Sequence, residues 1–278
     1  MKKKWFMALT IIMIVGILTG CLDNEKKIQL PENEINYLEE ESKVKEENKE
    51  VQKDKIETEV ISEYANNKNI TILIDPGHSK NPSKGVEKIS PNGNETKLKD
   101  TSGAMGETTR IPEYNIVMDV ALKLEKELLN KGYNVFLTRK EVNEALSNIE
   151  RAEEGNRLNA DLVIKLHCDS ATAKEAKGAS MLIPREKGYI TKEVEEKSKE
   201  YGKIVLEEYI RETNLNNRGL VYRNDLTGFN WSKVPIILLE MGFLSNKSDE
   251  LYLTQEESKE RIVEGISNGI DKIQFEKK

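Results

Sequence analysis

The stretch Thr71-Ile72-Leu73-Ile74-Asp75-Pro76-Gly77-His78 begins with an apolar run. The run is followed by the turn-forming residues Asp-Pro-Gly and then by a histidine. Residues 71–74 are rich in β-branched side chains, which predicts a short buried strand. Asp-Pro-Gly is typical of a chain turn, so the strand is expected to end there. His78 should therefore lie at the carboxyl end of a strand.

Two further apolar runs end in the same way. Residues 162–166 lead to His167, the second of the chain's two histidines, and residues 235–239 lead to Glu240. In open α/β sheets, ligands bind outside the carboxyl ends of the strands. We therefore expect His78, His167 and Glu240 to lie around one site.

Strands and helices alternate along residues 70–275, which indicates a single α/β domain. Apolar residues at helical spacing predict helices that open at residues 111–113, at 149, near 191 and near 254. The last of these begins where Thr254 and Glu257 resemble a capping box. Further strands are expected at residues 133–138 and 179–183, and loops at residues 79–110 and 218–231.

The N-terminal residues resemble a secretion signal. Lysines at positions 2–4 precede an apolar run of roughly 15 residues. This run is shorter than the roughly 20 residues that a transmembrane helix usually needs. The run ends in Leu18-Thr19-Gly20-Cys21, which resembles a bacterial lipoprotein cleavage box. This implies that residues 1–20 are a signal peptide and that Cys21 carries lipid; the alternative is an uncleaved membrane anchor. Either way, we expect an extracytoplasmic protein anchored to the cell membrane.

Residues 21–68 are expected to be a charged, flexible tether. They are rich in Glu, Lys and Asn and carry a net charge of −6, equal to that of the whole chain. Such a segment cannot bury enough apolar surface to offset its ordering entropy. Because the acidity lies in the tether and no basic patch is present, we expect no nucleic-acid partner.

The cysteines predict no disulfide. Cys21 is expected to carry lipid, which leaves Cys168 without a partner. Cys168 follows His167 on the predicted strand, and neighbours on a strand point to opposite faces. We therefore expect the Cys168 thiol to face away from the site and to take no part in catalysis.

Glu113 is a further candidate, because it lies in the first turn of the helix that follows the first loop. The helix dipole also favours a carboxylate at that position. Glu240 could likewise pair with an arginine such as Arg139 or Arg151. Residue spacing alone leaves open whether these carboxylates serve a metal site or have structural roles.

Several separated motifs, in order along residues 70–273, resemble the zinc-dependent N-acetylmuramoyl-L-alanine amidases of the family-3 type. The motifs are Ile74-Asp75-Pro76-Gly77-His78, Pro112-Glu113, Leu137-Thr138-Arg139, Arg151 with Asn156, Ile164-Lys165-Leu166-His167, and Val234-Pro235 through Glu240-Met241-Gly242-Phe243-Leu244-Ser245-Asn246. The resemblance implies a catalytic domain at residues 69–278 with a mixed, largely parallel sheet flanked by helices. It also implies a zinc ion held by His78, Glu113 and His167, with Glu240 as the catalytic carboxylate.

The implied reaction is hydrolysis of the amide bond between N-acetylmuramic acid and L-alanine in peptidoglycan. Two imidazoles and one carboxylate leave Zn²⁺ an open position for water, and Glu240 would act as the general base. No cofactor beyond the zinc is expected. Three departures from the family concern substrate detail: Ser79-Lys80 replace two glycines, Asp169 replaces an asparagine, and the loop 79–110 is long.

The loop 218–231 supplies candidate substrate contacts. Arg218 and Arg223 could bind a substrate carboxylate bidentately, and Trp231 could stack on sugar or peptide. The alternatives are exposed charges without a role and, for Trp231, a position in the core.

Two rival functions stay open. A zinc peptidase or carboxypeptidase would trim the stem peptides of peptidoglycan, and its products would carry shortened peptides in place of a free lactyl end. A non-catalytic cell-wall-binding lipoprotein would need neither zinc nor Glu240, and the intact set of site residues argues against it. The expected partners are peptidoglycan and the membrane, and no protein partner is indicated.

The lipoprotein interpretation predicts that Cys21→Ala releases or misprocesses the protein, because the acylated thiol is removed. Hydrolysis by the domain should be unchanged, since the tether holds no site residue. Metabolic labelling with a fatty acid should mark the wild-type chain and the Cys168→Ala control, but not Cys21→Ala. An unlabelled wild-type chain would contradict the prediction.

Overall fold

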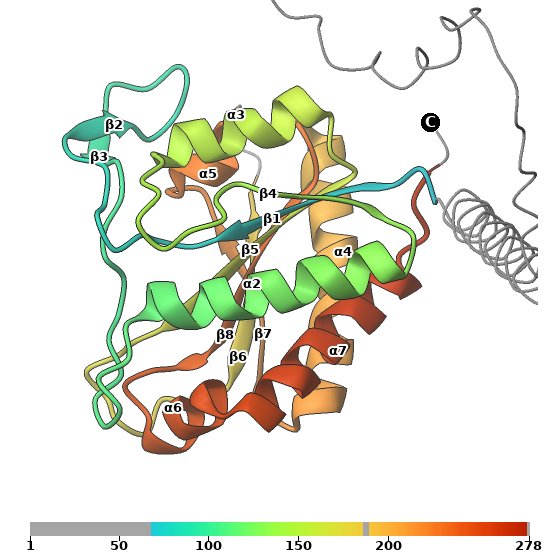
Figure 1. Ribbon diagram of the computed structural model, residues 1–278. Helices are drawn as coiled ribbons and strands as arrows, with labels where there is room; N and C mark the ends of the chain where they lie inside the picture. Colours follow the sequence, from blue (N-terminus) through green and yellow to red (C-terminus); the bar gives the residue numbers. More distant parts are fainter. Residues whose placement is uncertain (1–67, 186–188, 277–278) are drawn as a thin grey trace, which may run out of the picture. The chain divides into compact units, whose positions relative to one another are not determined.

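The computed structural model describes residues 68–185 and 189–276 (Figure 1). The predicted signal peptide, Cys21 and nearly all of the predicted tether lie outside the described residues. The helices are α2 (Glu113–Asn130), α3 (Asn148–Leu158), α4 (Lys192–Thr213), α5 (Thr227–Asn230), α6 (Lys247–Thr254) and α7 (Glu256–Lys272). The strands are β1 (Thr71–Pro76), β2 (Val86–Lys88), β3 (Thr96–Leu98), β4 (Asn134–Leu137), β5 (Leu162–Asp169), β6 (Ala179–Pro184), β7 (Asn217–Arg223) and β8 (Ile236–Phe243). Within the described ranges, no helix combines the length and apolar character needed to cross a membrane.

The central sheet has six strands in the order β4-β1-β5-β8-β6-β7. Neighbouring strands run parallel, except that β6 and β8 are antiparallel. The prediction of a mixed, largely parallel sheet is therefore confirmed. Because β1, β5 and β8 are adjacent, the prediction that their carboxyl ends lie side by side is confirmed as well.

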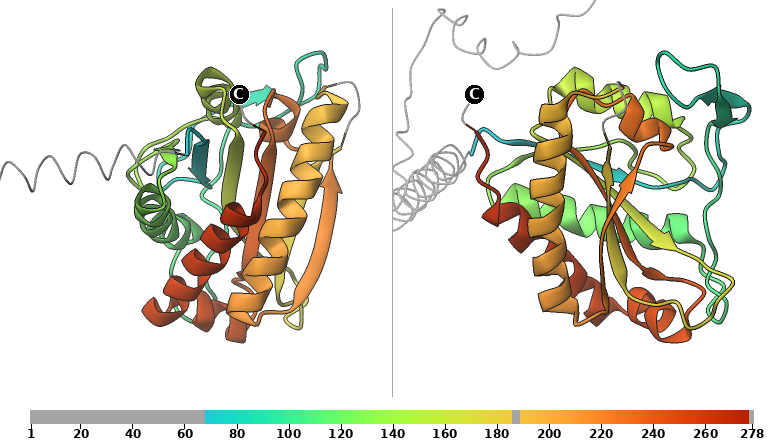
Figure 2. Two further views of the ribbon diagram at one scale, coloured as in Figure 1. Left: turned by 90° about the vertical axis from the view of Figure 1, so that its right-hand side faces the viewer. Right: turned by 180° about the vertical axis from the view of Figure 1, so that it is seen from behind.

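Helices cover both faces of this sheet (Figures 1 and 2). The larger core lies between the sheet and α2, α4 and α7, and a smaller core lies between the sheet and α3 with α5. In β5, Ile164 and Leu166 face the larger core, whereas Val163 faces the smaller one. A strand that is buried on both faces needs apolar residues on both, which explains the nearly uninterrupted apolar run.

The first expected loop, residues 79–110, contains an antiparallel hairpin of β2 and β3 that the sequence analysis missed. Its paired apolar residues Val86 and Leu98 are 57% and 58% exposed, so the hairpin has no core pattern in the sequence. The buried Glu87 attaches it to α3, because its carboxylate accepts hydrogen bonds from the amides of Asn148 and Ile149 at 3.2 and 3.1 Å. Amides at a helix N-terminus lack partners within the helix and favour a negative charge.

The second expected loop, residues 218–231, contains most of β7 and all of α5. β7 lies at the edge of the sheet, with Gly219 at a φ of 80° and a register shift against β6. These interruptions obscure the alternation that predicts a strand.

The expected capping box at Thr254 is wrong. Thr254 is the last residue of α6, and α7 begins after Gln255 without a side-chain cap. The Thr254 hydroxyl instead donates to the carbonyl of Glu250, 2.9 Å away. The short helix α6 therefore ends where the sequence suggested the start of the last helix.

The helices α4 and α7 lie side by side (Figure 2). They pack closely because α7 presents glycines to α4. A Cβ at Gly269 would come within 2.7 Å of the Val205 Cα, and a Cβ at Gly265 within 2.9 Å of the Tyr209 Cα. Both neighbours are backbone atoms, which cannot turn aside as a side chain can. The i, i+4 spacing places both glycines on one face of α7.

Gly269→Ala should lower the free energy of unfolding by about 1–2 kcal/mol. Alanine is favoured over glycine in a helix by about 1 kcal/mol, but overpacking costs about 1–3 kcal/mol, and the backbone contact puts this site at the upper end of that range. Glu264→Ala, on the exposed side of α7, is the control and should change stability by less than about 0.5 kcal/mol. Urea denaturation measures both; a Gly269→Ala protein as stable as wild type would show that the helices can separate without cost.

Candidate functional site

Three side chains from separate elements direct their ligand atoms to one place. His78 follows β1, Glu113 opens α2, and His167 lies near the end of β5. His78 Nε2 lies 3.2 Å from His167 Nδ1 and 3.3 Å from Glu113 Oε1. His167 Nδ1 lies 3.1 Å from the same carboxylate oxygen. The three ligand atoms therefore form a nearly equilateral triangle.

This triangle fits a tetrahedral metal ion. Ligand bonds of about 2.0–2.1 Å at tetrahedral angles separate neighbouring ligand atoms by about 3.3 Å. Two imidazole nitrogens and one carboxylate oxygen also leave a fourth position open for water or substrate. The spacing and the chemistry of the donors are thus those of a hydrolytic metal centre.

His78 is held by its backbone and by its second ring nitrogen. Its φ is 58°, in the left-handed region that non-glycine residues rarely adopt and that is found at functional sites. The carbonyl oxygen and the hydroxyl oxygen of Thr101 each lie 3.0 Å from His78 Nδ1. Because a carbonyl oxygen only accepts, Nδ1 carries the proton, and Nε2 presents its lone pair to the site.

Glu113 is buried, and two backbone amides orient its carboxylate. Ala104 donates to Oε2 at 2.7 Å, and Cys168 donates to Oε1 at 3.0 Å. Burial alone would raise the pKa of Glu113, but the imidazoles of His167 and His78 beside it hold this pKa well below its usual range. Glu113 is therefore ionised at neutral pH, as a metal ligand must be.

Two glycines make room for these side chains. A Cβ at Gly77 would come within 2.3 Å of the His167 ring, and a Cβ at Gly103 would come within 2.6 Å of Glu113 Oε2. Burial lowers the pKa of His167 to about 4, against a smaller opposing effect of the neighbouring Glu113 carboxylate. The imidazole of His167 is therefore neutral, which is the form that binds metal.

Glu240 lies beside this group on β8. It is the register partner of His167, so the two side chains leave the same face of the sheet. Its Oε2 is buried and has no hydrogen-bond partner within the described residues. Burial, and then the charges of Glu113 and Asp169, raise the pKa of Glu240 well above its ordinary value. A carboxyl group with a raised pKa is suited to accept and return a proton near neutral pH.

Arg139 and Arg151, the alternative partners considered for Glu240, bind the chain between β1 and His78 instead. Arg139 donates to the carbonyls of Pro76 and Gly77, at 3.0 and 2.8 Å. Arg151 donates to the carbonyls of Pro76 and His78, at 2.8 and 3.1 Å. These bonds fix three successive carbonyls and so determine where His78 lies.

A buried charge cluster lies beneath the site and was missed in the sequence. Asp75 is the direct register partner of Lys165 and is bonded to it, to Arg151 at 2.7 Å and to the Thr138 hydroxyl at 2.6 Å. Burial alone would raise the pKa of Asp75, but the charges of Lys165 and Arg151 hold it far below its usual range. The sequence does contain a signal for this cluster: Lys165 lies inside the apolar run 162–166, and a buried lysine needs a buried partner of opposite charge.

A cleft of about 230 Å³ opens beside the ligand triangle, and His78, His167 and Glu240 contribute to its lining. Of the predicted substrate contacts, Arg223 lines this cleft.

The other two predicted contacts lie outside the residues that line the cleft. The Arg218 guanidinium lies over the Phe243 ring at 4.9 Å, and the Trp231 indole donates to the Lys88 carbonyl at 3.3 Å. Substrate contact by Arg218 or Trp231 stays a prediction.

Cys168 packs in the larger core, away from the face that carries His167. Burial raises the pKa of its thiol well above the ordinary value, which makes the thiol a poor nucleophile. The prediction that this thiol faces away from the site is confirmed.

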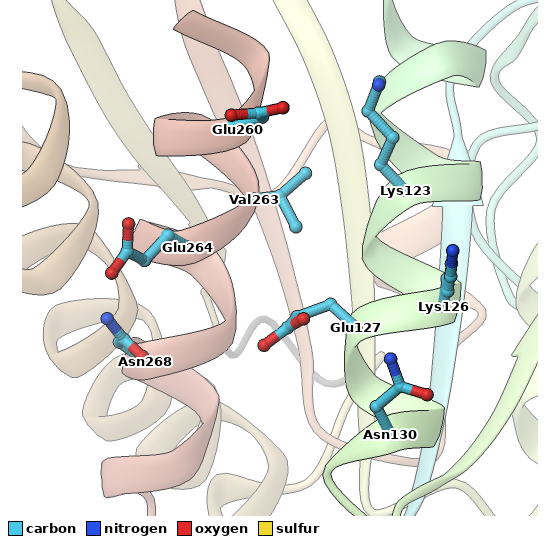
Figure 3. A pocket seen from close by; sticks show the side chains of 8 residues that line it. All are labelled: Lys123, Lys126, Glu127, Asn130, Glu260, Val263, Glu264 and Asn268. Carbon is cyan, nitrogen blue, oxygen red and sulfur yellow. The ribbon is translucent and has the colours of Figure 1, made fainter. Parts of the chain in front are cut away.

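A larger groove, of about 490 Å³, lies between α2 and α7 (Figure 3). Its lining mixes both charge signs with amides: Lys123, Lys126, Glu127, Asn130, Glu260, Val263, Glu264 and Asn268. These eight residues include no histidine and no cysteine. We therefore assign the chemistry to the cleft at the strand ends, where the ligand atoms converge.

Arg151→Met should lower the free energy of unfolding by about 3–5 kcal/mol, because it removes one partner from a buried ion pair. Arg157→Met is the matched control on the same helix. Arg157 is exposed and pairs with Glu154, so its loss should lower stability far less than the loss of Arg151. Urea denaturation of the two variants measures the difference, and equal stabilities would show that the cluster around Asp75 does not stabilise the domain.

Comparison with known proteins agrees with this geometry. Residues 72–272 match the family model described as N-acetylmuramoyl-L-alanine amidase. The chain is 24% identical over 243 residues to N-acetylmuramoyl-L-alanine amidase AmiC of Neisseria meningitidis serogroup B, over 74% of this chain and 53% of AmiC. It thus spans about half the length of that relative.

Two solved structures share the fold. The catalytic domain of the amidase CwlV from Bacillus (Paenibacillus) polymyxa var. colistinus aligns with a TM-score of 0.58 at 26% identity, over 72% of this chain and 96% of CwlV. The amidase Ami1 from Mycobacterium smegmatis aligns with a TM-score of 0.66 at 21% identity, over 73% of this chain and 95% of Ami1. With a family model that covers nearly the whole described domain, the chain belongs to the N-acetylmuramoyl-L-alanine amidase family.

Proposed function

We propose that this protein hydrolyses the amide bond between N-acetylmuramic acid and L-alanine in peptidoglycan. Membership of the amidase family supports this reaction. The observation that carries it is the ligand triangle of His78, Glu113 and His167, with edges of 3.1–3.3 Å. Glu240 stands beside that triangle with a buried oxygen that binds no described residue.

We infer that the metal is zinc. Two histidines and a glutamate with one open position are a ligand set of catalytic zinc sites. When bound, zinc would polarise the scissile carbonyl and make water a stronger acid. Thr101 supports this role by fixing the tautomer of His78, and the amides of Ala104 and Cys168 support it by fixing the Glu113 carboxylate.

Glu240 would move the proton. Its carboxylate takes a proton from the attacking water as the new C–O bond forms at the lactyl carbonyl. It then gives the proton to the nitrogen of L-alanine as the C–N bond breaks. The products are a free lactyl carboxylate on the sugar and a peptide with a free N-terminus. A side chain that serves in both directions needs a pKa near the working pH, and the raised pKa of Glu240 agrees with that requirement.

We further propose that lipid on Cys21 holds the domain outside the cytoplasm. The support is the composition of residues 1–21 and the charged segment that follows them. This position would bring the cleft to peptidoglycan, which lies outside the membrane.

Glu240→Gln and Glu113→Gln should separate catalysis from metal binding. Glu240→Gln keeps the ligand triangle, so zinc content should stay near one ion per chain while turnover falls by about 10²–10⁴-fold or more. Glu113→Gln replaces an anionic ligand with a neutral amide, so zinc itself should be lost. Metal analysis and hydrolysis of purified peptidoglycan give the two readouts for each variant and for wild type.

The reaction products identify the bond that the enzyme cleaves. Mass spectrometry should find soluble peptides that begin with L-alanine. Cleavage between two amino acids would favour a peptidase, and a fully active Glu240→Gln protein would refute the assigned general base. Active wild-type protein without bound zinc would refute the zinc assignment.

A further inference from the structure

We propose that Lys97 selects substrates that carry a carboxylate on the peptide side of the scissile amide. The proposal rests on the proposed amidase function and adds a specificity determinant to it. Lys97 belongs to β3 and lines the same cleft as His78, His167 and Glu240. It comes from the long loop 79–110, where the sequence departs from the family pattern.

Lys97 is a half-buried cation whose ammonium group forms no hydrogen bond or ion pair with the residues that the structure describes. Burial lowers the pKa of Lys97, as expected for a cation that has lost water without gaining a direct partner. An anion in the cleft would supply that partner.

The carboxylates that act on Lys97 at longer range are engaged with other groups. Glu87 is its cross-strand partner, but the Glu87 carboxylate accepts from the amides at the start of α3. Asp225 accepts from Arg223 Nε and a terminal guanidinium nitrogen at 2.7 and 2.8 Å. Neither carboxylate lies within ion-pair distance of Lys97.

The other cations that line the cleft are less available to a ligand. Lys165 is bonded to the buried Asp75. Arg223 has two donors committed to Asp225, so the bidentate substrate contact that its sequence position suggested would first have to break this pair. Lys97 is therefore the better candidate for a substrate carboxylate.

The hairpin that carries Lys97 is fixed to the domain. Asn148 Nδ2 donates to the Lys99 carbonyl at 2.7 Å, and Asn230 Nδ2 donates to the Ile89 carbonyl at 3.1 Å. These bonds join both strands of the hairpin, at residues next to β2 and β3, to α3 and α5. The backbone that carries Lys97 is thus held in place before substrate binds, which reduces the entropy lost on binding.

The ligand chemistry follows from this arrangement. An ammonium group forms a charge-assisted hydrogen bond with a carboxylate, and a carboxamide of the same shape lacks the charge. The residue that follows L-alanine in a stem peptide can carry its α-carboxyl group in either form. We therefore expect the enzyme to distinguish these two forms through Lys97.

The test uses two synthetic substrates, each an N-acetylmuramoyl-L-alanyl-D-glutamate whose γ-carboxyl group is capped as a methylamide. In one substrate the α-carboxylate is free, and in the other it is a carboxamide. Wild-type kcat/KM should be about ten-fold or more higher for the free carboxylate. Lys97→Met should lower kcat/KM for that substrate alone and remove the preference, whereas Lys97→Arg should keep most of it.

Two controls separate charge from structure. Lys88→Met changes an exposed lysine on the same hairpin and should leave the preference at the wild-type value. Added salt should weaken the preference of wild type, because salt screens a partly exposed ion pair, and should not change Lys97→Met. Equal cleavage of both substrates by wild type, or an equal loss on both by Lys97→Met, would overturn the role of Lys97 and leave the amidase function standing. Failure of wild type to cut the muramoyl–alanine bond in either substrate would overturn both proposals.

Discussion

The positions of the strand ends depend on the hydrogen bonds and ion pairs of the buried Asp75 carboxylate. It binds Lys165 of the neighbouring strand, Arg151 of α3 and the hydroxyl of Thr138, which follows β4. Four elements are thus tied to one point just before the chain reaches His78. Each charge would be costly to bury alone, and without Asp75 both Lys165 and Arg151 would lose their shared counter-ion. The assembly of β1, β4, β5 and α3 is therefore coupled to the position of the first ligand.

Neighbouring residues fix the positions of the three side chains in the ligand triangle. Thr101 fixes the ring of His78, and the amides of Ala104 and Cys168 fix the Glu113 carboxylate. Gly77 lets the His167 ring approach the chain directly. Ligands that are already in place bind metal without paying much ordering entropy. The loop 79–110 contributes to this support through Thr101 and Ala104, and it also carries the hairpin that places Lys97 in the cleft.

Much of the fold was predictable because its signals are local. The apolar runs before His78, His167 and Glu240 become adjacent strands, and the helices expected to open at residues 111–113, at 149 and near 191 are α2, α3 and α4. The misses have physical causes. The β2–β3 hairpin exposes its apolar side chains, and β7 is an interrupted edge strand, so neither carries the alternation of a half-buried strand.

The sequence by itself determined which residue types stand at the ends of the strands and where α2, α3 and α4 begin, because periodicity and turn chemistry are properties of neighbouring residues. Only the tertiary structure decided which charges meet. Arg151 could have paired with Glu240, yet it binds Asp75, and the carboxylate that Arg223 was expected to take from a substrate is supplied by Asp225. Such pairings depend on the order of strands and their register, which bring together residues far apart in the chain, and no local pattern encodes that choice.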